Sequence, residues 1–207
     1  MTRTRLSQLV LLLFLLSTAA LGQQARCDCE PALRHLCRCG VLIEQDVAEI
    51  QLAYLNRLML AEFREFLKES PVTTIRLAPA HKMVLKGESA QGYYDSDEQE
   101  MVINNSLQRD QALMVMAHEL GHAWQFEVQP DPDAISDFLA EGFAEWVSYH
   151  LIKRTGLVEF CSKIKTNPDP IYGNGFRWFF QVEEKFGPEA VINIMKTWTD
   201  LEGGRVP

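Results

Sequence analysis

The sequence predicts an α+β fold in which a small, mainly antiparallel sheet packs against two long helices and the C-terminal part is helical. Short β-branched, alternating segments are confined to residues 72–104, and segments with an apolar helical face lie on both sides of them. A chain of 207 residues suffices for one compact domain with a core, and hardly for two. Its composition, 47% hydrophobic and 23% charged, excludes a disordered chain, a collagen-like fibre and a coiled-coil rod.

The elements follow from local patterns. Residues 41–68 contain neither Gly nor Pro and predict the first helix. Strands are then expected at residues 72–77, 83–85, 91–94 and 100–104, the last two forming a hairpin around the turn at 95–97. Further helices are expected at residues 108–126, 134–154, 175–184 and 188–198. No internal repeat or linker divides residues 41–207, which we interpret as a single domain.

The N-terminus has the features of an export signal. Arg3 and Arg5 precede an apolar run at residues 9–16, and small residues follow at 17–22. This order is typical of a cleavable secretory signal, and the apolar run is shorter than the ~20 residues of a membrane span. We therefore interpret residues 1–22 as a signal peptide, with an uncleaved anchor as the alternative. The mature protein is expected to be periplasmic or extracellular, without stable membrane insertion.

The charge balance is acidic. The chain has 20 Lys+Arg against 28 Asp+Glu, a formal net charge of −8. Loss of residues 1–22 removes two arginines and no acid, which makes the charge −10. Such a surface is a poor match for a phosphate backbone, so nucleic acid is not expected as a partner.

Four of the five cysteines lie close together in residues 23–40, which we interpret as a leader before the domain. They are Cys27, Cys29, Cys37 and Cys39. An oxidising compartment favours disulfides between the two pairs, whereas two thiolate pairs also suit one structural zinc ion. Zinc sites usually separate paired cysteines by two residues or more, and here one residue intervenes. Disulfides are the first interpretation, zinc the second and free thiols the third; Cys161 is expected to be a buried apolar residue.

The main candidates for metal binding and catalysis lie in the segment His118-Glu119-Leu120-Gly121-His122, within the helix expected at residues 108–126. Residues i and i+4 share a helical face, so both imidazoles can face one ion while Glu119 points toward the same pocket. This is the metalloprotease arrangement of two zinc ligands and a carboxylate general base. The alternative is a pair of solvated histidines, but the neighbouring residues 113–117, 120, 123 and 124 are apolar.

A third ligand is expected on the next helix. Position 128, where the metzincin pattern has a histidine, is Val128. Glu141 lies in the largely apolar stretch 138–146, and an antiparallel second helix would bring it to the ion. Glu145, one turn later, would then accept a hydrogen bond from the far nitrogen of a zinc-bound histidine; its alternative is a solvated helix face. The competing oxygen ligands are Asp131, Asp133 and Asp137.

The motif His118-Glu119-x-x-His122, followed after eighteen residues by Glu141-Gly142 and then by Glu145, resembles the gluzincin metallopeptidases, the group that includes thermolysin and aminopeptidase N. The flanking residues are most similar to the minimal peptidase domains of plant growth-regulating LIM-domain peptidases and their bacterial relatives, over residues 72–198. The resemblance implies one catalytic Zn²⁺ held by both histidines and Glu141, with Glu119 as base. It also implies that an edge strand, here residues 100–104, holds the peptide. A complete LIM module is absent, so partner-dependent regulation is not carried over.

In addition to the metal, a hydrogen-bond donor is needed to stabilise the oxyanion that forms when a peptide bond is hydrolysed. Similar enzymes use a Tyr or His from beyond the ligand helices. Tyr172 lies in the turn Pro170-Ile171-Tyr172-Gly173 before a helix and is the preferred candidate, with Tyr149 and His150 as alternatives. The competing interpretation of Tyr172 is simple packing at a helix entry.

Taken together, these residues predict a secreted zinc peptidase that acts on a peptide or protein substrate. A Gly-x-Met-x-Asn-like aminopeptidase motif is not found in the sequence, which favours an endopeptidase. Two other functions stay open at this point. One is a non-catalytic zinc-binding interaction protein, and the other is a zinc hydrolase of a non-protein amide, because the ligands activate water without choosing the acyl group.

Overall fold

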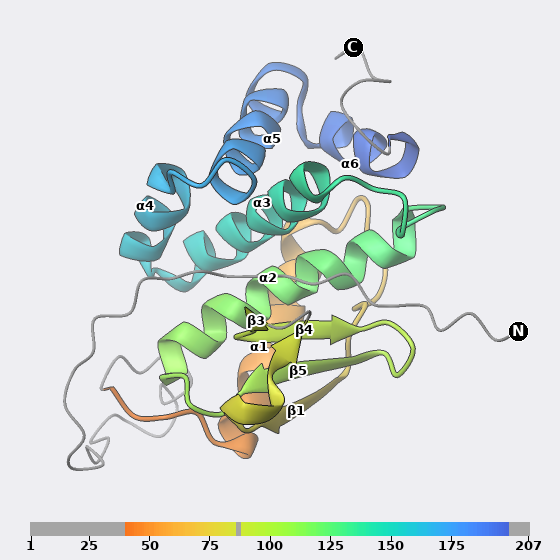
Figure 1. Cartoon of the computed structure of the whole chain (residues 1–207). Coiled ribbons are helices and arrows are strands. Elements are labelled where there is room, and N and C mark those ends of the chain that lie inside the picture. Colours follow the sequence, from red (N-terminus) through yellow and green to blue (C-terminus); the bar gives the residue numbers. More distant parts are fainter. Residues whose placement is uncertain (1–39, 86–87, 199–207) are drawn as a thin grey trace, which may run out of the picture.

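Figure 1 shows the computed structural model of the chain, which describes residues 40–85 and 88–198. The predicted signal peptide and the four clustered cysteines lie outside these residues. The helices are α1 (Gln45–Glu62), α2 (Arg109–Val128), α3 (Asp137–Thr155), α4 (Val158–Thr166), α5 (Tyr172–Phe186) and α6 (Pro188–Thr197), with a 3₁₀ turn at Ala80–Lys82. The strands are β1 (Thr74–Ala78), β2 (Val84–Leu85), β3 (Glu88–Ser89), β4 (Gly92–Asp95) and β5 (Glu100–Asn104). The predicted α+β class is confirmed.

The main sheet has the order β1-β5-β4. β4 and β5 form the predicted antiparallel hairpin, with Tyr93 opposite Val102. β1 pairs with β5 in parallel, with Ile75 opposite Met101, so this sheet is mixed. β2 and β3 form a separate two-stranded antiparallel ribbon. The central strand is thus β5, and β4 is an edge of the described sheet.

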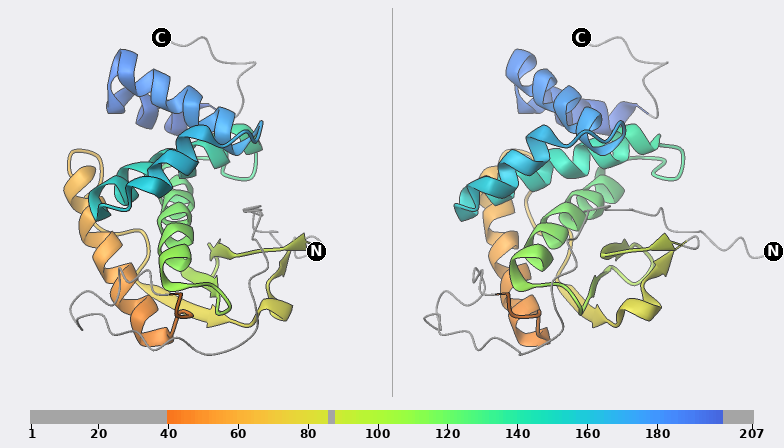
Figure 2. Two further views of the ribbon diagram at one scale, coloured as in Figure 1. Left: turned by 90° about the vertical axis from the view of Figure 1, so that its left-hand side faces the viewer. Right: turned by 60° about the vertical axis from the view of Figure 1, so that its left-hand side comes forward.

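The helix α2 lies at the centre of the molecule, between the sheet and α3 (Figures 1 and 2). Its first turn is closed by a reciprocal contact in which the Gln108 and Gln111 side chains each accept from the other residue's backbone N–H. From Ala112 to Gln125 every residue of α2 is buried. A helix buried on all sides shows no amphipathic stripe, so its polar residues are enclosed too.

The helices above α2 stack in further layers. α3 packs on α2, and α5 packs on the far side of α3 (Figure 2). The α3–α5 crossing is close because both helices have glycine there: a Cβ on Gly142 would lie 2.7 Å from the Cα of Gly175. This crossing brings the start of α5 next to the residue that follows Glu141.

Aromatic rings fill the space between α1, α2 and α3. The ring of Phe63 lies 5.0 Å from that of Trp124 and 5.3 Å from that of Trp146, between centroids. Trp124, Phe143 and Trp146 are fully buried. Burial of such rings contributes about 1.5–3 kcal/mol each, so the helices that carry the polar site are held by a large apolar core. Among the described residues, none of the helices has the length and apolarity to cross a membrane.

Candidate metal centre

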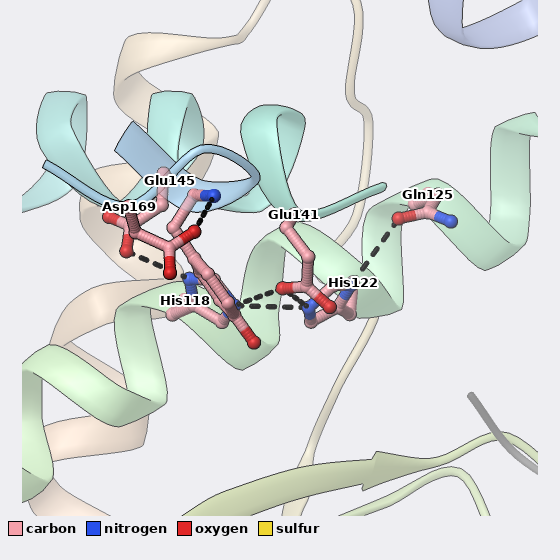
Figure 3. A network of polar contacts seen from close by, with 7 residues as sticks. His118, His122, Gln125, Glu141, Glu145 and Asp169 are labelled. Carbon is pink, nitrogen blue, oxygen red and sulfur yellow. Dashed lines mark hydrogen bonds and ion pairs between the residues drawn. The ribbon is translucent and has the colours of Figure 1, made fainter. Parts of the chain in front are cut away.

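Two helices bring one polar cluster together in the interior. His118 and His122 lie one turn apart on α2, and Glu141 reaches them from α3 (Figure 3). The three residues are between 1% and 5% exposed. Their ligand atoms lie within 4.8 Å of one another, and this is the metal-competent cluster found among the described residues. The structure therefore places the three predicted ligands together.

The donor atoms have the spacing of a tetrahedral site. The Nε2 atoms of His118 and His122 are 3.0 Å apart. The Oε2 atom of Glu141 lies 3.2 Å from the first and 3.3 Å from the second. Nitrogen and oxygen ligands at ordinary zinc distances, placed at tetrahedral angles, are about 3.3 Å apart. The three side chains thus fit an ion of this kind without rearrangement.

Burial and mutual charge set the ionisation of the cluster. Burial lowers the pKa of His118. Burial also works to lower the pKa of His122, but the charge and hydrogen bond of Glu141 raise it to about 9. The Glu141 carboxylate is itself pushed toward a higher pKa by burial, and the facing histidines more than offset this and lower its pKa. To hold a cation, the cluster would need an anionic Glu141 and two unprotonated imidazoles, so binding would displace the proton that the raised pKa leaves on His122.

Each of the two clustered histidines has a polar neighbour at its other ring nitrogen. The Nδ1 atom of His122 faces Oε1 of Gln125 at 3.3 Å. The Nδ1 atom of His118 faces Oε1 of Glu145 at 3.8 Å, an ion-pair contact that is longer than a hydrogen bond. Such neighbours orient metal-bound imidazoles and select their tautomer. Glu145 was expected from the sequence; Gln125, a fully buried side chain one turn after His122, was missed.

Glu119 lies between α2 and the edge strand. Its side chain is buried, its Oε2 atom has no hydrogen-bond partner, and burial raises its pKa to about 7 while a hydrogen bond from the Tyr94 backbone opposes that shift. β4 comes this close because Gly92 has no side chain; a Cβ there would lie 2.4 Å from Val115 and 3.4 Å from Glu119. A carboxyl group with a pKa near 7 is suited to exchange protons.

The strand expected to lie along the cleft was the wrong one. The resemblance implied that residues 100–104 hold the peptide, although the sequence did not identify the edge of the sheet; β5 is flanked by β1 and β4, so its main chain is already paired on both sides. β4 is the strand that packs beside α2, and Tyr94 approaches Glu119. The sequence of a hairpin does not show which of its two strands pairs with a third strand. Here β1 pairs in parallel with β5, which leaves β4 at the edge.

Tyr172 lies at the site. Its ring centroid is 6.0 Å from that of His118, with 33° between the ring planes. The alternatives are engaged elsewhere: Tyr149 packs against Phe176, and His150 contacts Glu62 and Glu183. The competing ligands Asp131, Asp133 and Asp137 are all exposed. Cys161 is buried, as expected.

Residues 52–146 match the model of a protein family described as "Putative metallopeptidase family (DUF6782)". This part of the chain is therefore similar to the members of that family. The matched stretch runs from within α1 to Trp146 on α3, so it includes both histidines, Glu119, Glu141 and Glu145, whereas Tyr172 lies beyond it. Neither the search of curated proteins nor the search of solved structures found a match.

Proposed function

We propose that this protein is a zinc-dependent peptidase of the gluzincin type. The observation that carries the proposal is the triangle of His118, His122 and Glu141 donor atoms, buried and spaced for one tetrahedral ion. Similarity of residues 52–146 to a metallopeptidase family supports the same conclusion. Two imidazoles and a carboxylate are a ligand set known from catalytic zinc sites, and they leave the fourth position for water.

When bound, zinc lowers the pKa of a coordinated water toward ~7 and polarises the substrate carbonyl. Glu119, a buried carboxyl group next to His118 in the chain, accepts the proton of the attacking water and then transfers it to the leaving amine. The phenol of Tyr172 donates a hydrogen bond to the oxyanion that develops on the carbonyl. Glu145 and Gln125 hold the two imidazoles in the orientation that presents Nε2 to the ion.

β4 is the strand suited to hold an extended substrate. It is an edge of the described sheet, and it runs beside α2 where Glu119 lies. Main-chain groups on the outer side of an edge strand can pair with a peptide in the manner of an added strand. This mode of binding reads the peptide backbone away from its termini, which supports an endopeptidase.

The proposal extends to the parts of the chain outside the described residues. The basic and apolar composition of residues 1–22 supports export to the periplasm or the extracellular space, and Cys27, Cys29, Cys37 and Cys39 would then form disulfides or hold a second, structural zinc. The substrate is a peptide or protein.

The test is hydrolysis of a mixed peptide library, followed by mass spectrometry, with zinc content measured on the same preparation. Wild-type protein should cleave internal peptide bonds and contain zinc in the His118–Glu141 site. Glu119→Gln should retain zinc and lose cleavage by about 10³-fold or more, because the base is removed while the ligands stay. Glu189→Gln on α6 is the matched control and should cleave normally. Undiminished cleavage by Glu119→Gln, or a folded protein without affinity for zinc, would refute the proposal.

A further inference from the structure

The turn that leads into α5 is closed by one residue, Asp169. Its Oδ1 atom accepts hydrogen bonds from the backbone N–H groups of Ile171 and Tyr172, at 2.8 and 2.9 Å. Its backbone oxygen accepts from the N–H groups of Gly173 and Asn174, both at 3.1 Å. A helix N-terminus leaves about four N–H groups without intrahelical partners, and here Asp169 satisfies four in succession.

Neighbouring residues hold Asp169 itself. Asn167 Oδ1 accepts from the Asp169 N–H at 3.0 Å. The Arg177 guanidinium, one turn into α5, donates to the Asn167 carbonyl at 2.7 Å and to Asn174 Oδ1 at 2.5 Å. Gly173 completes the turn, because a Cβ at this position would lie 2.0 Å from the Asn167 carbonyl oxygen. These hydrogen bonds and the close contact at Gly173 therefore fix the conformation of the turn.

This turn carries Tyr172 to the metal centre. The Tyr172 N–H is one of the two groups that the Asp169 side chain binds, and the Tyr172 ring lies 6.0 Å from the ring of His118. Figure 3 shows Asp169 at the His118 end of the site, on the side of Glu145 and away from His122. Asp169 fixes the backbone from which the Tyr172 side chain extends. A change in the turn would therefore move the phenol relative to the ligands.

We propose that Asp169 is a positioning residue for Tyr172. Through the start of α5 it fixes the phenol at the point where the oxyanion forms; the proposal rests on the function proposed above. The role requires a short side chain with an acceptor at Oδ1, which Asn shares and Ala lacks. Asp169 touches neither substrate nor ion in this scheme and acts through Tyr172 alone.

The kinetic test uses the zinc-loaded full chain and the best peptide from the library. Tyr172→Phe should lower kcat by about 10²-fold, the usual effect of losing one oxyanion donor. Asp169→Ala should lower kcat by about tenfold or more with little change in KM, and Asp169→Asn should stay within about threefold of wild type. In the Tyr172→Phe background, Asp169→Ala should cause no further loss, because both changes remove the same interaction. Asp46→Ala, an exposed acid in the first turn of α1, is the matched control.

A second readout does not depend on activity. The metal-free chain is labelled with 3-fluorotyrosine, and the Tyr172 ¹⁹F signal is assigned by its absence in Tyr172→Phe. Asp169→Ala should shift or broaden that signal, while Asp169→Asn should leave it in place. If Asp169→Ala does not fold, Asp169→Ser, which keeps a weaker acceptor, should give intermediate values in both experiments.

The outcomes separate the two proposals. An unchanged ¹⁹F signal in Asp169→Ala, or kcat losses that add in the double variant, would overturn the role of Asp169. Normal kcat in Tyr172→Phe would instead remove Tyr172 from the catalytic proposal, and the ¹⁹F signal would still decide whether Asp169 positions its ring. Absence of any peptide cleavage by wild type contradicts the proposed function itself.

Discussion

The Nε2 atoms of His118 and His122 lie 3.0 Å apart, and both face the same oxygen of Glu141. Two unprotonated imidazole nitrogens at this distance repel each other unless a proton or a cation lies between them. The site is also buried, so water cannot disperse the charge. A cation in the centre satisfies both nitrogens and the carboxylate at once, which is the physical reason for the metal predictions that follow.

The first prediction concerns zinc stoichiometry. Native mass spectrometry of the chain under non-reducing conditions should show one zinc in the α2–α3 site, and His122→Ala should lose that zinc because one of three protein ligands is gone. His81→Ala is the control, since His81 is exposed on the 3₁₀ turn. A second zinc that survives in His122→Ala would belong to the cysteine cluster. If His122→Ala kept all its zinc, the assignment of the ligands would be wrong.

The second prediction is that the metal-free protein loses stability between about pH 6.5 and pH 9. Burial raises the pKa of Glu119 to about 7 and that of Glu145 to about 8, while Glu141 raises the pKa of His122 to about 9 against burial. Above about pH 6.5 the unfolded chain has already released these protons, whereas the folded chain releases them only as the pH passes about 7, 8 and 9 in turn, so raising the pH favours unfolding. His118, whose pKa is lowered, acts in the opposite direction only below about pH 6.5.

Thermal unfolding of the EDTA-treated protein, measured across this range, checks the prediction. Its Tm should fall as the pH rises from 6.5 to 9. Added zinc should raise Tm more at pH 8.5 than at pH 6.5, because fewer protons compete for the ligands. A metal-free Tm that rises over this range would contradict the assigned shifts.

Much of the site could be predicted because its residues obey local geometry. His118 and His122 needed only the helical period, and Glu141 only the assumption of an antiparallel neighbouring helix. The boundaries of β5, residues 100–104, were predicted as observed, since alternation and a turn bracket the strand. α3 and α6 were also placed to within a few residues, between capping signals such as Gly156 and Pro188.

The errors arise where partners are distant in sequence. The parallel pairing of β1 with β5 joins two strands separated by residues 79–99, and no local pattern encodes it. The start of α5 was expected at residue 175 and lies at Tyr172, because the glycines there disfavoured a helix until Asp169 and the crossing at Gly142 are taken into account. α4 was missed because it has only nine residues. Gln125 could have been found, as the i+3 neighbour of His122.

The third prediction concerns Gln125. Replacing it with Met keeps the volume but removes the acceptor at 3.3 Å from His122 Nδ1. Zinc affinity should fall by about 10–100-fold, the usual effect of losing such a partner. Stability of the metal-free protein should change little, because the Gln125 amide nitrogen is buried without a partner and its removal is no loss.

Competition with a zinc chelator of known affinity measures the effect. Gln181→Met, the same substitution at an exposed position on α5, is the control. Unaltered zinc affinity in Gln125→Met would show that Gln125 does not orient His122.

The fourth prediction concerns the crossing of α3 and α5. A Cβ at Gly142 would lie 2.6–2.9 Å from backbone atoms of Gly175, and backbone cannot move aside as a side chain can. Gly142→Ala should therefore cost about 1–3 kcal/mol of unfolding free energy and weaken zinc binding through its neighbour Glu141. Gly156→Asn is the control, since nothing lies within 4 Å of that position and Asn tolerates its positive φ. The unfolding free energies of the two variants are measured in urea. Equal values for Gly142→Ala and the control would mean that the α3–α5 crossing accommodates the added methyl group without cost.

The fifth prediction concerns a polar network that joins α1, α3 and α5 and stabilises the fold without contacting the metal site. His150 on α3 faces Glu62 of α1 at 3.1 Å through Nδ1 and Glu183 of α5 at 3.0 Å through Nε2. The same Glu183 oxygen also accepts a hydrogen bond from Nε1 of Trp146 at 2.8 Å. Burial pushes the pKa of Glu183 upward, but hydrogen bonds from His150 and Trp146 more than offset it and lower that pKa. Glu183 therefore stabilises the fold above its unfolded pKa of about 4.5, and this contribution is lost as the pH falls through its folded pKa.

Glu183→Gln should cost about 1–3 kcal/mol near neutral pH, because it removes the charge that two donors face. The difference from wild type should shrink as the pH falls from about 4.5 through the lower pKa of folded Glu183, below which this residue is protonated in both states. Zinc content should not change, since this network lies on another face of α3 from Glu141. Glu184→Gln, at the next and exposed position of α5, should match wild type throughout. A difference between Glu183→Gln and wild type that stays constant down to pH 3 would show that shape, not charge, is what Glu183 contributes to the three helices.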